Sequence, residues 1–169
     1  MLTQERLKEL YFYNSIDGWF TFASKRSRFV IGDRAGSTLM TGYRQILIDG
    51  YYYREHRLAW LYIYGEWPEE LDHIDGDRAN NSIRNLRPAT RSQNNFNSDR
   101  PTGVSGLRGA CFDRRDRKWF SRIKTGCETI WLGKFDTAEE AAKAYREAAE
   151  LHHGEFAFHN RTRPIEEAM

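Results

Sequence analysis

The sequence predicts an α+β chain of two small domains joined by a short linker. Its 169 residues suit one medium domain or two small ones. The 24 aromatic side chains (10 Phe, 9 Tyr and 5 Trp) give enough apolar surface for a folded core. A stretch containing Pro, Gly and Ser but no apolar pattern marks the boundary. We expect domains at 1–97 and 107–160, a linker at 98–106 and a tail at 161–169.

The chain begins with a predicted short helix and an aromatic strand. Thr3 is a suitable N-cap for a helix with Leu7, Leu10 and Tyr11 on one side. Alternation over 19–22 then predicts a strand. Aromatic residues dominate this part of the chain, so we expect it to buttress the hairpin at 43–54. Contact with a polyanionic partner through its basic residues stays an alternative, and these are Lys25, Arg26, Arg28 and Arg34.

This β-hairpin is followed by a helix. The runs 43–48 and 51–54 flank an Asp-Gly dipeptide at 49–50, which favours a tight turn between two strands. Helical spacing continues over 58–64, and Gly65 is placed to end that helix. Residues 1–65 are therefore predicted to support the polar segment at 66–97.

Residues 66–97 are rich in Asp and Asn. Asn side chains bond local backbone groups, so such loops are typically turns and helix caps. Asp75 and Asp77 resemble the start of a calcium loop, but no Glu completes that pattern. Thr90 and Gln93 form a capping box, which predicts a short helix.

The same segment holds side chains suited to phosphodiester hydrolysis. Mg²⁺ prefers carboxylate and amide oxygens, and a neutral imidazole accepts a proton from water. Asp72, His73 and Asn94 are of these types. Neighbours in a regular strand point to opposite faces, so Asp72 and His73 can serve one site only where the strand ends. A hairpin with Asn caps is the alternative.

Four ordered blocks make this region resemble the HNH endonucleases of phages and mobile introns. The blocks are Asp72-His73-Ile74-Asp75-Gly76, Asn80-Asn81, Asn85-Leu86-Arg87 and Gln93-Asn94-Asn95, after Arg54-x-His56-Arg57-Leu58-Ala59-Trp60. The resemblance covers about residues 40–97. It implies a ββα-metal fold, in which a hairpin and a helix surround one divalent metal ion.

The resemblance also implies residue roles. It assigns the metal ligands Asp72 and Asn94, the general base His73 and the loop brace Asn85. Mg²⁺ is the expected ion and Mn²⁺ the second choice. Zinc is not expected, because Ser98 stands where some relatives have a third His. His56 and Arg87 have either a structural or a phosphate-orienting role.

The second domain is predicted to contain three strands and a helix. Strands are predicted at 109–113, 118–124 and 129–134. Thr137 and Glu140 form a second capping box, and an alanine stripe behind it lets the helix lie close to a sheet. The helix is expected to cover the sheet face that carries Trp119 and Ile123, and to end in two cations, His152 and His153.

The opposite face of this sheet is basic. The window 105–124 has seven basic residues against two acidic ones, a net charge of +5, with aromatic side chains between them. Such a surface is typical of nucleic-acid binding, and a solvated charged hairpin is the alternative.

The run from Ile130 to Tyr145, with Gly106-x-Arg108-Gly109 before it, resembles the plant ethylene-response-factor (Apetala-type) DNA-binding domain over about residues 105–160. The resemblance implies a sheet in the DNA major groove. The residues facing DNA would be Arg108, Arg122, Lys124, Thr129 and Trp131, with phosphate contacts from Arg114, Arg115 and Arg117 in a turn. Cys111 and Asp113 replace arginines of plant members, so the plant target sequence is not expected.

Together the two resemblances imply a metal-dependent endonuclease of the phage or homing type that nicks or cuts duplex DNA. The alternatives are a DNA-binding regulator with an inactive HNH segment and a nuclease acting on RNA. One site cuts one strand, so a monomer would nick and a dimer could cut both strands; the sequence does not fix the oligomeric state.

Acidic and basic residues at positions 5–9 and the short apolar run 58–64 argue against export or a membrane. We expect the host bacterial cytoplasm.

Overall fold

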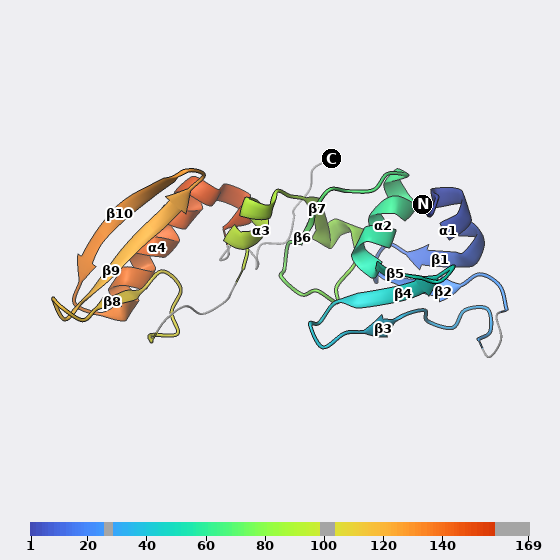
Figure 1. Cartoon of the computed structure of the whole chain (residues 1–169), viewed down its shortest axis with the longest axis horizontal. Helices are drawn as coiled ribbons and strands as arrows, with labels where there is room; N and C mark the ends of the chain where they lie inside the picture. The colour runs from blue at the N-terminus through green and yellow to red at the C-terminus, as the bar shows by residue number, and fades with distance from the viewer. Residues whose placement is uncertain (26–28, 99–103, 158–169) are drawn as a thin grey trace. The chain divides into compact units, whose positions relative to one another are not determined.

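The computed structural model describes residues 1–25, 29–98 and 104–157. It divides into two compact units, Met1–Thr90 and Arg91–Met169 (Figure 1). The predicted α+β class is confirmed. None of the helices in the described ranges is both long and apolar enough to span a bilayer.

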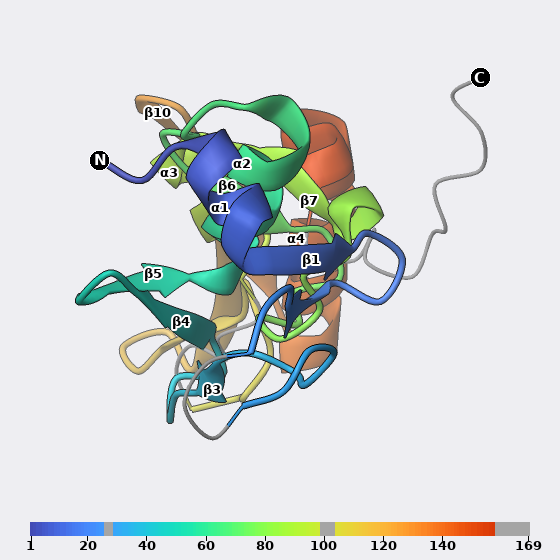
Figure 2. The same ribbon diagram turned by 90° about the vertical axis from the view of Figure 1, so that its right-hand side faces the viewer.

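In its described residues, the first unit contains three small antiparallel sheets and two α-helices. Figures 1 and 2 place both helices on the same side of the β3–β4–β5 sheet. The elements are α1 (Gln4–Leu10), β1 (Tyr11–Asn14), β2 (Trp19–Phe22), β3 (Ser37–Thr38), β4 (Arg44–Ile48), β5 (Tyr51–Arg54), α2 (Glu55–Tyr64), β6 (Leu71–His73), a 3-10 turn (Ile83–Asn85) and β7 (Leu86–Pro88).

The first helix is shorter than predicted. The Thr3 side chain accepts a hydrogen bond from the Arg6 backbone N–H, as expected of an N-cap. The assignment of Tyr11 to this helix is wrong, because Tyr11 begins β1 and pairs with Phe22. Its ring is 1% exposed and packs at 5.3 Å from the Phe22 ring. Burial in an aromatic cluster therefore decides its conformation over helical spacing.

The predicted hairpin and helix of the first unit are present. Asp49 and Gly50 have φ values of 48° and 86°, which gives the tight turn that joins β4 to β5. Gly65 ends α2 at φ 77°. Ile46, Ile48 and Leu58 contribute to one continuous core, which also includes side chains from α1, β1 and β2.

The second unit is a three-stranded antiparallel sheet covered by a long helix. Strand order is β10-β9-β8, and α4 lies along one face (Figure 1). The elements are α3 (Arg91–Phe96), β8 (Cys111–Asp113), β9 (Lys118–Thr125), β10 (Glu128–Phe135), α4 (Ala138–His153) and a 3-10 turn (Gly154–Phe156).

The alanine stripe of α4 packs as predicted. The capping box of Thr137 and Glu140 begins the helix. Its buried alanines contact the sheet face that carries Trp119 and Ile123. Small side chains let the helix approach the sheet closely, and the opposite, basic face remains exposed.

The end of α4 differs from the prediction. His153 is buried, its Nε2 lies 3.0 Å from the Lys124 carbonyl oxygen, and burial lowers the pKa of its imidazole. Its ring stacks on Phe96 of α3 with centroids 3.7 Å apart. The interpretation of His153 as a cation at the end of the last helix is therefore wrong.

These contacts group α3 with the second unit. The sequence-based boundary at 98–106 stays a prediction. Residues 99–103 of that linker, Arg26 and Arg28, and residues 158–169 with the predicted tail lie outside the described residues.

Candidate active site and nucleic-acid interface

The candidate catalytic residues lie in a two-stranded ladder of β6 and β7. Asp72 pairs with Arg87, and His73 pairs with Leu86. His73 is the last residue of β6, and a turn comes directly after it. Asp72 and His73 therefore stand at the end of a strand, with their side chains on opposite faces. A strand end is where we expected the site, because only there can both side chains serve it.

Asp72 forms an ion pair across the ladder. Its Oδ2 accepts hydrogen bonds from Arg87 Nε at 3.0 Å and Nη2 at 2.8 Å. Both side chains are largely buried. Hydrogen bonds between charged groups are among the stronger ones, so this contact holds Arg87 across the ladder. This contact favours the structural reading of Arg87 over phosphate orientation.

His73 points into the interior of the first unit and is 5% exposed. Burial lowers the pKa of its imidazole, opposed by its hydrogen bond with Asn81 and by nearby aspartates. Its Nε2 lies 3.0 Å from Asn81 Oδ1. Histidine with a lowered pKa is neutral near pH 7, which is the state that accepts a proton.

His56 lies beside His73, and both rings are close to Tyr43. The two imidazoles meet edge to face with centroids 5.1 Å apart. His56 is 9% exposed, and burial, followed by the charges of His73 and Arg57, lowers its pKa to about 3. A neutral His56 cannot attract phosphate as a cation near pH 7, so its position favours the structural role.

Asn85 closes the loop between β6 and β7. Its Nδ2 donates to Asp75 Oδ1 at 2.9 Å and to the Asn80 carbonyl at 2.8 Å. Its Oδ1 accepts from the Asp75 backbone N–H at 3.0 Å. Three bonds from one amide group hold the loop in shape, which is the geometry a loop brace needs.

Asn94 lies on α3 in the second unit. Within the described ranges, no three His, Cys, Asp or Glu side chains converge as a metal site. The predicted donor set is instead one carboxylate, Asp72, and one amide, Asn94. Both supply the hard oxygen ligands that Mg²⁺ and Mn²⁺ prefer, so the residue types fit such an ion.

The β1–β2 hairpin, which we call the N-terminal hairpin, contacts the loop that carries Asn81. The Tyr13 hydroxyl donates to the Asn81 carbonyl at 2.7 Å, and the Ser82 hydroxyl donates to the Ser15 carbonyl at 3.1 Å. Gly18 has a φ of 75°, and a Cβ there would lie 2.1 Å from the Ser82 backbone nitrogen. These contacts support the buttressing role expected of this part of the chain.

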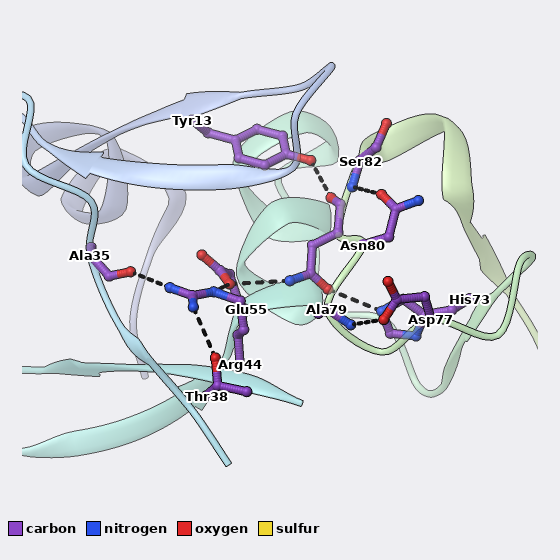
Figure 3. Close-up of polar contacts among 11 residues, drawn as sticks. Tyr13, Ala35, Thr38, Arg44, Glu55, His73, Asp77, Ala79, Asn80 and Ser82 are labelled. Carbon is purple, nitrogen blue, oxygen red and sulfur yellow. Dashed lines mark hydrogen bonds and ion pairs between the residues drawn. The ribbon is translucent and has the colours of Figure 1, made fainter. Parts of the chain in front are cut away.

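Sequence reasoning missed a buried ion pair behind His73 (Figure 3). Arg44 Nε donates to Glu55 Oε2 at 2.5 Å, and the guanidinium also donates to Thr38 and the Ala35 carbonyl. Burial raises the pKa of the Glu55 carboxyl, opposed by Arg44. An acidic residue in the first turn of a helix commonly serves the helix dipole, so no local signal distinguishes Glu55.

The exposed sheet face of the second unit brings four predicted DNA-binding residues together. Trp131 pairs with Arg122, and Thr129 pairs with Lys124, on adjacent strands. Trp131 is 54% exposed, and its ring stacks on Phe120 with centroids 5.3 Å apart. The face thus presents two cations beside a flat aromatic surface.

The turn from β8 to β9 carries three more predicted residues, all exposed: Arg114, Arg115 and Arg117. Asp113 and Asp116 at this turn both pair with Lys134. Arg108 is half-buried, with its guanidinium donating to the Asn95 carbonyl at 3.1 Å and lying over the Tyr145 ring. These contacts lie within the second unit, and the role of Arg108 in DNA binding stays a prediction.

Two protein families match this chain in sequence. The HNH endonuclease family matches residues 53–96, which include Glu55, the β6–β7 ladder and Asn94. The AP2 domain matches residues 105–154, which include the sheet and all of α4. These matches confirm both resemblances and support a nuclease with DNA binding.

Three relatives agree with the two matches. Protein 3.8 of Escherichia phage T7 is 32% identical over 107 residues, 62% of this chain and 88% of that protein. An uncharacterized HNH endonuclease of Acanthamoeba polyphaga mimivirus is 36% identical over 109 residues, 63% of this chain and 56% of that protein. An ethylene-responsive transcription factor of Medicago truncatula is 41% identical over 66 residues, 38% of this chain and 22% of that protein. No solved structure matches the chain. The chain therefore belongs to the HNH endonuclease family and carries an AP2 domain after its HNH segment.

Proposed function

We propose that this protein is a metal-dependent endonuclease that hydrolyses a phosphodiester bond in duplex DNA, and that its AP2-type sheet holds the DNA. The observation that carries the proposal is the β6 terminus, where Asp72 and a buried, neutral His73 are consecutive residues. A carboxylate and a neutral imidazole at the end of one strand suit hydrolysis better than a purely structural hairpin.

In this proposal His73 is the general base. It accepts a proton from water, and the resulting hydroxide attacks phosphorus while the phosphorus–oxygen bond to the leaving nucleotide breaks. Asp72 and Asn94 are the residues that would hold one divalent ion, Mg²⁺ or Mn²⁺. When bound, that ion offsets the negative charge that develops on the phosphate. Asn85 keeps the loop between β6 and β7 in place.

The second unit supplies affinity and position. Arg122, Lys124 and the arginines of the β8–β9 turn would contact phosphates, and Trp131 with Thr129 would lie against the major groove. The major groove admits β-strands, so we favour duplex DNA as the partner of this basic sheet. The phage relative supports a phage-type enzyme acting on DNA in the cytoplasm of its bacterial host.

The test is cleavage of supercoiled plasmid with Mg²⁺, with Mn²⁺ and with EDTA. We expect metal-dependent relaxation, lost in His73→Ala and kept in the matched control His152→Ala, whose side chain is exposed on α4. Duplex binding by His73→Ala should stay within about twofold of wild type, because phosphate contacts dominate affinity. Salt-dependent duplex binding without cleavage of plasmid or of genomic DNA would instead favour a regulator with an inactive HNH segment.

A further inference from the structure

A row of buried polar side chains runs from β4 to His73 (Figure 3). Arg44 of β4 contacts Glu55 of α2, Glu55 contacts Asn81, and Asn81 contacts His73. Glu55 and Asn81 are each 0% exposed. Polar groups are costly to bury unless they are hydrogen-bonded, so the directions of these bonds are chemically constrained.

The constraint begins at Glu55. Arg44 Nε is a donor only, so Glu55 Oε2 accepts from it at 2.5 Å. The same oxygen lies 3.1 Å from Asn81 Nδ2, and it accepts from that amide group as well. The opposite orientation of the Asn81 amide would place two acceptor oxygens against each other in a buried site. Glu55 therefore directs the Asn81 carbonyl oxygen toward His73.

The Asn81 backbone is held independently of its side chain. Its carbonyl accepts from the Tyr13 hydroxyl at 2.7 Å, and Gly18 packs directly against the peptide that joins Asn81 to Ser82. The residue therefore cannot shift without disturbing the N-terminal hairpin. The side-chain amide is fixed at both ends, by its backbone and by Glu55.

The consequence for His73 is a defined tautomer. Asn81 Oδ1 can only accept, so the His73 Nε2 that lies 3.0 Å away must carry the hydrogen. In a neutral imidazole the lone pair is then on Nδ1. We propose that Glu55 and Asn81 are positioning residues that hold His73 in the tautomer with Nδ1 as its basic nitrogen. This inference rests on the proposed role of His73 as general base.

A purely structural role for the row is the competing explanation. In that case Glu55 and Arg44 would only join α2 to β4, and loss of Asn81 would lower stability without changing the His73 tautomer. The two explanations therefore differ in a spectroscopic property of one imidazole.

The tautomer of His73 can be measured by NMR. Long-range ¹H–¹⁵N spectra of the full-length, ¹⁵N-histidine-labelled protein are recorded in EDTA at about pH 8, where an unperturbed histidine is neutral. His73→Ala identifies the His73 signals. We expect wild type to show a protonated Nε2 and an unprotonated Nδ1. A protonated Nδ1 in wild type would overturn the proposal, and this measurement needs no variant that might fail to fold.

Two variants complete the test. Asn81→Leu keeps the side-chain size but removes the acceptor, and should give a mixture of tautomers. Asn80→Ala disturbs the same loop through its bond to Asp75 and should keep the wild-type tautomer. An unchanged tautomer in a folded Asn81→Leu variant would contradict the proposal.

Kinetics provide a second readout. Asn81→Leu should lower kcat for plasmid nicking about ten- to hundredfold with KM unchanged, as is typical when an orienting partner is lost. The tautomer is measured without metal or DNA, so a protein that cleaves nothing can still confirm or refute it. Failure of the proposed function and failure of this inference are therefore distinguishable.

Discussion

Replacing His56 by Gln should make the first unit less sensitive to acid. Folding lowers the pKa of His56 from its ordinary value of 6.5 to about 3, mainly through burial. Below pH 6.5 the unfolded chain binds a proton at this position that the folded chain does not, so acid favours unfolding. The stability is fully present above pH 6.5 and is lost as the pH falls toward 3.

The size of the effect is set by the pKa difference. Each pH unit below 6.5 costs about 1.4 kcal/mol for one such histidine, so lowering the pH from about 7 to about 5 costs wild type about 2 kcal/mol through His56 alone. The lowered pKa of His73 adds to the loss in the same direction. His56→Gln removes the loss of stability through His56 and keeps the loss through His73.

Hydrogen exchange of the α2 amides, monitored by mass spectrometry in EDTA at both pH values, measures this difference within the first unit. His152→Gln, in the second unit, is the matched control and should leave it unchanged. A His56→Gln variant that loses as much stability between the two pH values as wild type does would refute the assignment of a low pKa to His56.

Three further predictions concern binding and packing. Arg122→Ala and Lys124→Ala should each weaken duplex binding and reduce the slope of log binding constant against log salt concentration by about one. Unchanged slopes in both variants would mean that the sheet does not contact DNA. Gly18→Ala should destabilise the first unit by more than 1 kcal/mol in urea unfolding, roughly the lower bound for a strained backbone, because its Cβ meets Ser82 backbone atoms. Leu58→Ala, at a fully buried position, should cost about 2–5 kcal/mol, and a smaller loss would indicate a collapsible core.

Local chemistry predicted much of the fold. The Asp-Gly turn at 49–50, the helix end at Gly65 and the capping box at Thr137 depend on a few neighbouring residues, and each is present. Tyr11 and His153 were misjudged because distant side chains decide their environment. The first packs on Phe22 and the second on Phe96, neither of which their own sequence neighbourhoods reveal.

The candidate site likewise contains residues that the sequence predicts and residues that it does not. Asp72, His73 and Asn85 could be predicted because their order and spacing carry the family resemblance. Glu55 could not, since its contact with Asn81 joins residues 26 positions apart and depends on how α2 packs. Side chains that orient a catalytic group are set by tertiary packing, which a motif does not encode.

The two units have separate cores, and this separation bears on how binding and cleavage combine. The core around Leu58 draws on side chains of the first unit, whereas Ile123 and the α4 alanines form those of the second. The exposed sheet face belongs to the second unit, whereas His73 and the core around Leu58 belong to the first. Arg122→Ala should therefore lower cleavage only as far as it lowers DNA occupancy, and saturating DNA should restore the wild-type rate. A rate that stays low at saturation would mean that the sheet also positions the phosphate for attack, and that chemistry and binding are not separable in this chain.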